Sequence, residues 1–123
     1  MIKKEADIVS LHIPLTDDTI YMCNDVFFNS FENQILFINT ARGKIVNTKH
    51  LVNALKNNMV NGVGLDVLEN EDFENLSLPL KNTYKELFNS KNTIITPHVA
   101  GWSFQSFENI SKVLVRNILE LTD

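Results

Sequence analysis

Residues 35–43 read Ile35-Leu36-Phe37-Ile38-Asn39-Thr40-Ala41-Arg42-Gly43, a short apolar run that gives way at once to polar residues. Four consecutive apolar residues are typical of a strand that is covered on both faces of a parallel sheet. A helix is expected soon afterwards, over residues 48–57, with Asn47 as its N-cap. This stretch therefore predicts one strand–loop–helix unit of an α/β fold, with Arg42 in the loop.

Strands and helices are expected to alternate along the rest of the chain. Further strands are predicted at residues 7–12, 62–66 and 93–96. Further helices are predicted at residues 24–31, around 84–88 within an otherwise irregular 67–92, and from 103 onward. The last helix carries an apolar stripe at spacings of three and four, formed by Phe107, Ile110, Leu114, Ile118 and Leu121. This alternation favours right-handed βαβ units and a parallel sheet.

The composition is typical of one soluble globular domain: 123 residues, 44% of them hydrophobic and 21% charged. A net charge of −4 and the lack of a basic cluster argue against a nucleic-acid partner. No apolar run reaches membrane-spanning length, and the first residues do not form a secretory signal. The single Cys23 cannot form an internal disulfide, so a cytoplasmic location is expected.

Three chemically distinct side chains follow predicted strands: Arg42, Glu71 and His98. In an open parallel sheet, groups at the carboxyl ends of the strands gather in one crevice, where ligands bind. A guanidinium binds a carboxylate through two parallel hydrogen bonds, and an imidazole beside a carboxylate can exchange protons near neutral pH. The three together predict redox chemistry on a small hydroxy acid.

The sequence also allows other roles to be considered for residues of these types. Glu69 lies two residues before Glu71 and is an alternative acid for the same role. A metal site built from His12, His50 and His98 is not expected, because no two of them have the helical or turn spacing of metal ligands. Cys23 is expected to be a small buried apolar group rather than a nucleophile.

Four motifs occur in order along nearly the whole chain. They are Ala6-Asp7-Ile8-Val9-Ser10-Leu11-His12-Ile13-Pro14-Leu15-Thr16, Ile38-Asn39-Thr40-Ala41-Arg42-Gly43, Gly64-Leu65-Asp66-Val67 with an acid five places after Asp66, and Thr96-Pro97-His98-Val99-Ala100-Gly101. Together they resemble the D-isomer-specific 2-hydroxyacid dehydrogenases, in the C-terminal part of their NAD-binding domain. The five-residue offset from Asp66 selects Glu71 over Glu69. Asp72 departs from the family, in which a proline commonly follows the glutamate, and Trp102-Ser103 is one of several endings that the family uses.

The resemblance implies a role for each matching residue. His98 would be the general acid/base, Glu71 would orient the imidazole and favour its protonated form, and Arg42 would bind the substrate carboxylate and polarise the adjacent carbonyl. Asp66 would accept a hydrogen bond from the nicotinamide carboxamide. The positions that line the cofactor in the family match Ile13, Thr40, Ala41, Arg42, Asp66, His98 and Gly101.

One element of the family's NAD-binding domain has no counterpart in the sequence. A Gly-x-Gly-x-x-Gly turn binds the cofactor diphosphate, but the chain has glycines only at 43, 62, 64 and 101. The expected fold is therefore a partial Rossmann-type parallel sheet with flanking helices, lacking the Gly-rich βαβ half. Residues 1–123 are interpreted as the incomplete C-terminal portion of an NAD-binding domain, that is, as a fragment, a split gene product or a truncated reading frame.

The function that the resemblance implies is hydride transfer between a nicotinamide cofactor and a D-2-hydroxy acid. The ending at Trp102-Ser103 looks most like phosphoglycerate dehydrogenase-type members, which makes 3-phosphoglycerate a candidate substrate. NAD is the expected cofactor, with NADP open, and the full-length enzyme is expected to be a homodimer. Two alternatives are an inactive fragment with an exposed strand edge and a dehydrogenase-like interaction module, as in the related C-terminal-binding corepressors.

Overall fold

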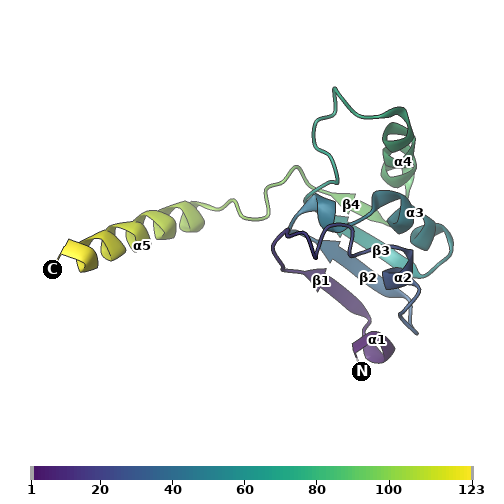
Figure 1. Ribbon diagram of the computed structural model, residues 1–123, viewed down its shortest axis with the longest axis horizontal. Helices are drawn as coiled ribbons and strands as arrows, with labels where there is room; N and C mark the ends of the chain where they lie inside the picture. Colours follow the sequence, from purple (N-terminus) through teal and green to yellow (C-terminus); the bar gives the residue numbers. More distant parts are fainter. Residues whose placement is uncertain (1, 123) are drawn as a thin grey trace.

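The computed structural model describes residues 2–122 and has the predicted α/β architecture (Figure 1). Its strands form one parallel sheet in the order β1-β2-β3-β4, with bounds Ile8–Leu11, Ile35–Asn39, Val60–Leu65 and Thr93–Ile95. The helices are α1 (Ile2–Glu5), α2 (Asp25–Phe28), α3 (Thr48–Lys56), α4 (Leu78–Asn89) and α5 (Phe104–Thr122), with a short 3-10 turn at Gly43–Ile45. The predicted parallel sheet with flanking helices is therefore confirmed.

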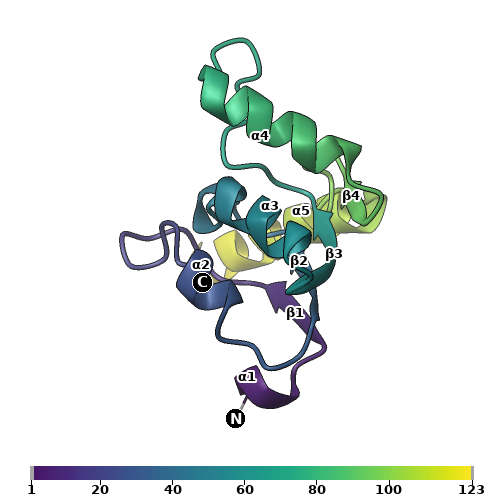
Figure 2. The same cartoon turned by 90° about the vertical axis from the view of Figure 1, so that its right-hand side faces the viewer.

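Helices α2, α3 and α4 lie along one side of the sheet (Figure 2). Each of them connects a strand to its neighbour, and each connection steps in the same direction across the sheet. Right-handed crossovers that step in one direction must place their helices on the same face. The core forms between these helices and the sheet, where Phe37, Leu51 and Leu87 are fully buried.

The opposite face of the sheet is open, contrary to what the apolar run at 35–38 predicted. Ile35 and Phe37 point into the core, but Leu36 between them is 44% exposed, and Ile94 on β4 is 73% exposed. The expectation of a strand covered on both faces is wrong for this structure, since all three crossover helices lie on one face. The strands themselves pair in register: Val9 on β1 is the partner of Phe37 on β2, and Phe37 is the partner of Val63 on β3.

The segment 67–92 is more helical than the sequence predicted. The short helix expected around 84–88 extends over Leu78–Asn89, begins with Pro79 in its first turn, and buries Tyr84 and Leu87. Proline is well tolerated in the first turn of a helix. Pro79 is therefore compatible with a helix start here, where the sequence analysis expected an irregular segment. The Tyr84 hydroxyl on this helix bonds the backbone of Asn70, in the segment that follows β3.

Helix α5 projects away from the sheet (Figure 1). Its apolar stripe is exposed, including Phe107, Ile110 and Leu114. Among residues 2–122, no helix combines the length and the hydropathy needed to cross a bilayer.

Candidate active site

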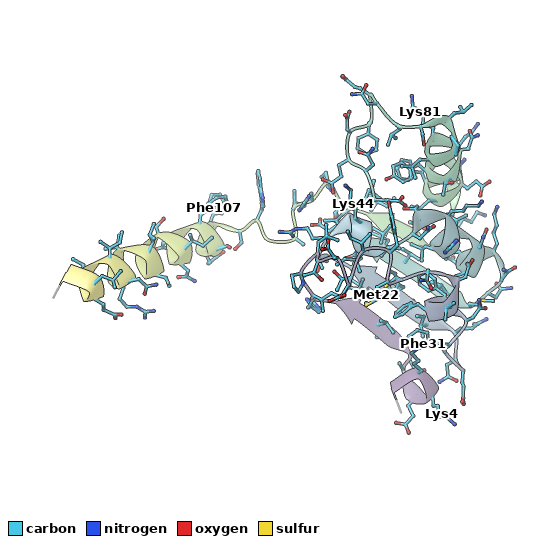
Figure 3. All side chains as sticks on the ribbon, viewed as in Figure 1. Lys4, Met22, Phe31, Lys44, Lys81 and Phe107 are labelled. Carbon is cyan, nitrogen blue, oxygen red and sulfur yellow. The ribbon has the colours of Figure 1, made fainter. Side chains whose placement is uncertain are left out.

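The loops at the carboxyl ends of β2, β3 and β4 lie at one edge of the sheet. Arg42 follows β2, Glu71 follows β3 and His98 follows β4, and all three line one hollow of about 240 Å³. Lys44, labelled in Figure 3, also lines this hollow. Side chains that are 29 and 27 residues apart in the sequence therefore meet where ligands bind in open parallel sheets.

His98 and Glu71 form a hydrogen-bonded pair. His98 Nδ1 lies 3.0 Å from Glu71 Oε2. A carboxylate only accepts hydrogen bonds, so Nδ1 carries a proton and Nε2 is left to exchange a proton with a ligand. The other oxygen, Glu71 Oε1, accepts from the backbone N–H of Leu68 at 3.2 Å. His98 has a φ of 56°, in the left-handed region, so an unusual backbone conformation places the ring.

Glu69, the alternative acid, has a different set of partners. Its Oε2 accepts from the backbone N–H of Thr48, the first residue of α3, at 2.9 Å. Its Oε1 accepts from the Tyr21 hydroxyl at 3.2 Å. A carboxylate at a helix N-terminus stabilises that helix, so the contacts of Glu69 are structural. The structure therefore brings Glu71, rather than Glu69, to the imidazole.

Asp66 holds the loop that carries His98. Asp66 is only 5% exposed as a residue. Its Oδ1 accepts from the Thr96 hydroxyl and from the Val99 backbone N–H, the latter at 2.9 Å, and its Oδ2 accepts from the Ala100 N–H at 2.8 Å. The sequence suggested a contact with the nicotinamide carboxamide for this residue. That contact stays a prediction, but the loop-holding role was missed.

The hydrogen bonds to Asp66 predict how the pKa of its carboxyl group is shifted, and this shift can be tested. Burial alone would raise the pKa of Asp66, but hydrogen bonds from Thr96, Ala100 and Val99, together with nearby His98, outweigh it and lower the pKa below 3.8. A lowered pKa means that the ionised carboxylate stabilises the fold above the unfolded value and loses this effect as pH falls through the folded value. In an NMR titration, we expect the Val99 and Ala100 amide resonances to shift with a midpoint below that of an ordinary aspartate. A midpoint at or above the ordinary aspartate value, or an unchanged titration in Asp66→Asn, would contradict this assignment.

Asn39 holds the loop that carries Arg42. Its fully buried side chain accepts from the Ala41 N–H and donates to the Arg42 carbonyl, both at 3.0 Å. The Arg42 guanidinium donates through Nη1 to the Ala41 carbonyl at 2.6 Å and is exposed at the edge. Sequence reasoning missed Asn39, although an asparagine directly after an apolar run is a known turn signal.

The other predicted cofactor-lining residues lie around the same edge. Ile13 follows β1 and is half-buried against the core, Thr40 is exposed after β2, and Ala41 is half-buried. Gly101 is exposed after β4, and a Cβ there would meet no described atom within 4 Å. Each of them follows the carboxyl end of a strand, and contact with a cofactor remains a prediction. Within residues 2–122, no three His, Cys, Asp or Glu side chains are grouped as they are around a metal ion.

The sequence matches the model of one protein family. The model is described as "D-isomer specific 2-hydroxyacid dehydrogenase, NAD binding domain", and it matches residues 1–100. The chain belongs to the D-isomer-specific 2-hydroxyacid dehydrogenase family. The part that matches includes every strand and the loops that carry Arg42, Glu71 and His98.

Individual members of the dehydrogenase family resemble the chain over almost all of its length. A glyoxylate reductase of Pyrococcus furiosus is 37% identical over 116 residues, which is 94% of this chain and 32% of the reductase. A Lactobacillus delbrueckii ssp. bulgaricus D-isomer-specific 2-hydroxyacid dehydrogenase, in its NAD-complexed form, has a TM-score of 0.82 and 34% identity over 98% of this chain and 38% of its own. An Aquifex aeolicus D-lactate dehydrogenase, complexed with NAD and lactic acid, has a TM-score of 0.80, also at 34% identity, over 98% of this chain and 38% of its own. The chain thus spans between 32% and 38% of the length of these relatives.

Proposed function

We propose that residues 1–123 are the C-terminal portion of the NAD-binding domain of a D-2-hydroxyacid dehydrogenase. In this proposal the chain supplies the acid/base pair and the carboxylate-binding group for the interconversion of a 2-oxo acid and a D-2-hydroxy acid. The observation that carries it is the convergence of Arg42, Glu71 and His98 on one hollow, with His98 Nδ1 and Glu71 Oε2 3.0 Å apart.

Each of the three side chains has a chemical task in this reaction. His98 Nε2 donates a proton to the substrate carbonyl oxygen in reduction and accepts the hydroxyl proton in oxidation. Glu71 holds Nδ1–H and stabilises the imidazolium by its negative charge. The Arg42 guanidinium binds the substrate carboxylate and so orients the reacting carbon toward the imidazole. When bound, the nicotinamide cofactor supplies or accepts the hydride.

The residues at the edge fit the nicotinamide end of such a cofactor. Half-buried Ile13 and Ala41 offer apolar contacts beside the loops. Asp66 accepts three hydrogen bonds, whereas a carboxylate has about four lone-pair sites, so it can still accept from a carboxamide. Residues 1–123 contain no Gly-x-Gly-x-x-Gly turn, so the proposal for this chain concerns the nicotinamide end alone. NAD is the proposed cofactor because relatives of similar structure are NAD complexes.

The relatives narrow the proposed substrate class. Those named here are a glyoxylate reductase and a D-lactate dehydrogenase, and both names refer to short 2-oxo or 2-hydroxy acids. We therefore rank glyoxylate and pyruvate ahead of 3-phosphoglycerate as candidate substrates. A homodimeric full-length enzyme in the cytoplasm stays part of the proposal.

Replacing Arg42 with lysine tests the carboxylate-binding role. Lysine keeps the charge but cannot form the two parallel hydrogen bonds of a guanidinium. In the dehydrogenase that contains this chain, Arg42→Lys should lower kcat/KM for 2-oxo acids by roughly 10–100-fold, the scale of a lost charged hydrogen bond. The assay is NADH oxidation with glyoxylate, pyruvate and 3-phosphohydroxypyruvate, the last being the oxidised form of 3-phosphoglycerate.

A matched control is Lys44→Arg, which changes the other cation of the same hollow. If Arg42→Lys leaves kcat/KM unchanged, or if analogues without a carboxylate are reduced equally well, the carboxylate-binding role is wrong.

A further inference from the structure

Tyr84 contacts the loop that carries Glu71 through its hydroxyl. The residue belongs to α4 and is 2% exposed. Its hydroxyl donates to the Asn70 carbonyl and accepts from the Asn70 N–H, both at 2.9 Å. Asn70 immediately precedes Glu71. One side chain thus binds both backbone groups of the residue next to Glu71.

The ring of Tyr84 is held by aromatic neighbours. Phe88, one turn further along α4, stacks on it with ring centroids 5.7 Å apart, and Phe73 lies on the loop side at 6.3 Å. A ring packed in this way has little freedom to move, so its hydroxyl presents a fixed partner to the loop. The loop itself is irregular between β3 and α4, and therefore depends on such side-chain contacts for its shape.

The hydroxyl stays protonated throughout the physiological pH range. Burial, as the largest cause, raises the pKa of Tyr84 to about 12. The group can therefore donate to the Asn70 carbonyl and accept from the Asn70 N–H at the same time, whenever the enzyme works.

We propose that Tyr84 is a positioning residue for Glu71: its hydroxyl holds the Asn70 backbone so that the Glu71 carboxylate faces His98 Nδ1. The local geometry supports this, because the backbone N–H of Leu68 binds Glu71 Oε1 and the Tyr84 hydroxyl binds Asn70. The contacts fix the turn on both sides of the carboxylate. The inference rests on the proposed role of the Glu71–His98 pair but is tested separately from it.

The test is Tyr84→Phe, which keeps the packed ring and removes only the hydroxyl. It leaves the Asn70 N–H and carbonyl without their partner, which is unfavourable for a part-buried peptide. The readout is the tautomer of His98 in the full chain, measured from imidazole ¹⁵N shifts at a pH where the ring is neutral. The wild type should be mainly Nδ1–H, and Glu71→Gln should show a mixture with Nε2–H. Tyr84→Phe should move toward the Glu71→Gln spectrum.

The matched control is Thr83→Val on the same helix. The Thr83 hydroxyl donates to the Pro79 carbonyl within α4, so its loss removes a hydroxyl without touching the loop. The control should keep the wild-type His98 spectrum. If Tyr84→Phe also keeps it while Glu71→Gln changes it, Tyr84 has only a structural role and the inference is wrong.

A second measurement does not depend on the variant folding. In the wild type, the Asn70 amide should be protected from hydrogen exchange to about the level of the α4 amides, since its acceptor is a buried hydroxyl. Rapid exchange at Asn70 would overturn the inference.

In the dehydrogenase, Tyr84→Phe should lower kcat about 10-fold with little change in KM. The proposed function itself would fail differently: Glu71→Gln and His98 variants would then leave turnover intact.

Discussion

His98→Asn should lower the turnover of the proposed dehydrogenase by roughly 10²–10⁴-fold, the usual scale for a lost general acid/base. Asparagine tolerates the left-handed backbone region better than most residues, so the φ of 56° at this position is retained. The side chain can still form a hydrogen bond but cannot exchange a proton near neutral pH. The variant therefore removes the proton transfer and leaves the loop in place.

The measurement is steady-state reduction of a 2-oxo acid by NADH, with the fold checked by circular dichroism. His50→Asn is the control, because His50 does not line the hollow. Its Nε2 instead lies 3.3 Å from Oδ2 of Asp25, which belongs to α2. Equal turnover in His98→Asn and the wild type would remove His98 from the mechanism, and the acid/base pair with it.

Gly43→Ala should be the most destabilising small substitution in the site. A Cβ at position 43 would lie 1.7 Å from the Leu68 carbonyl oxygen and 2.1 Å from its carbon. Neither atom belongs to a flexible side chain, so the two backbone segments must separate. We expect a loss of about 3 kcal/mol in the free energy of unfolding, at the upper end for inserting a methyl group into packed structure.

Denaturant unfolding of the full chain measures this loss, and Gly101→Ala is its matched control. A Cβ at position 101 meets no described atom within 4 Å, and neither glycine has a positive φ. The control should therefore change stability by less than about 0.5 kcal/mol. If the two variants are equally stable, the close approach of the 43 and 68 backbones is not present in solution.

The sequence was sufficient to predict the parts of this molecule that depend on local pattern. Apolar runs such as Ile35–Ile38 located the strands, and the polar residues directly after them located Arg42 and His98. The choice of Glu71 over Glu69 came only from the offset shared with the family. The hydrogen bond between Glu71 and His98 gives a geometric reason for choosing Glu71.

The contacts that were missed join residues whose spacing carries no local signal. Asp66 and Ala100 are 34 positions apart, and Tyr84 and Asn70 are 14 apart. Whether such side chains meet depends on the lengths of loops and helices, and the length of α4 was itself underestimated. The open face of the sheet was missed for a similar reason, because an apolar run shows that a strand is apolar but not what covers it.

The backbones of Gly43 and Leu68 approach each other closely and so connect two of the loops around the hollow. Gly43 adjoins Arg42, and the Leu68 loop carries Glu71, while Asp66 fastens the His98 loop to the end of the same strand. The three loops are thus linked mechanically, and a displacement of one is passed to the others. A protein engineer who rebuilds the arginine loop must therefore also allow for the His98–Glu71 pair, because the backbones of the loops are in contact.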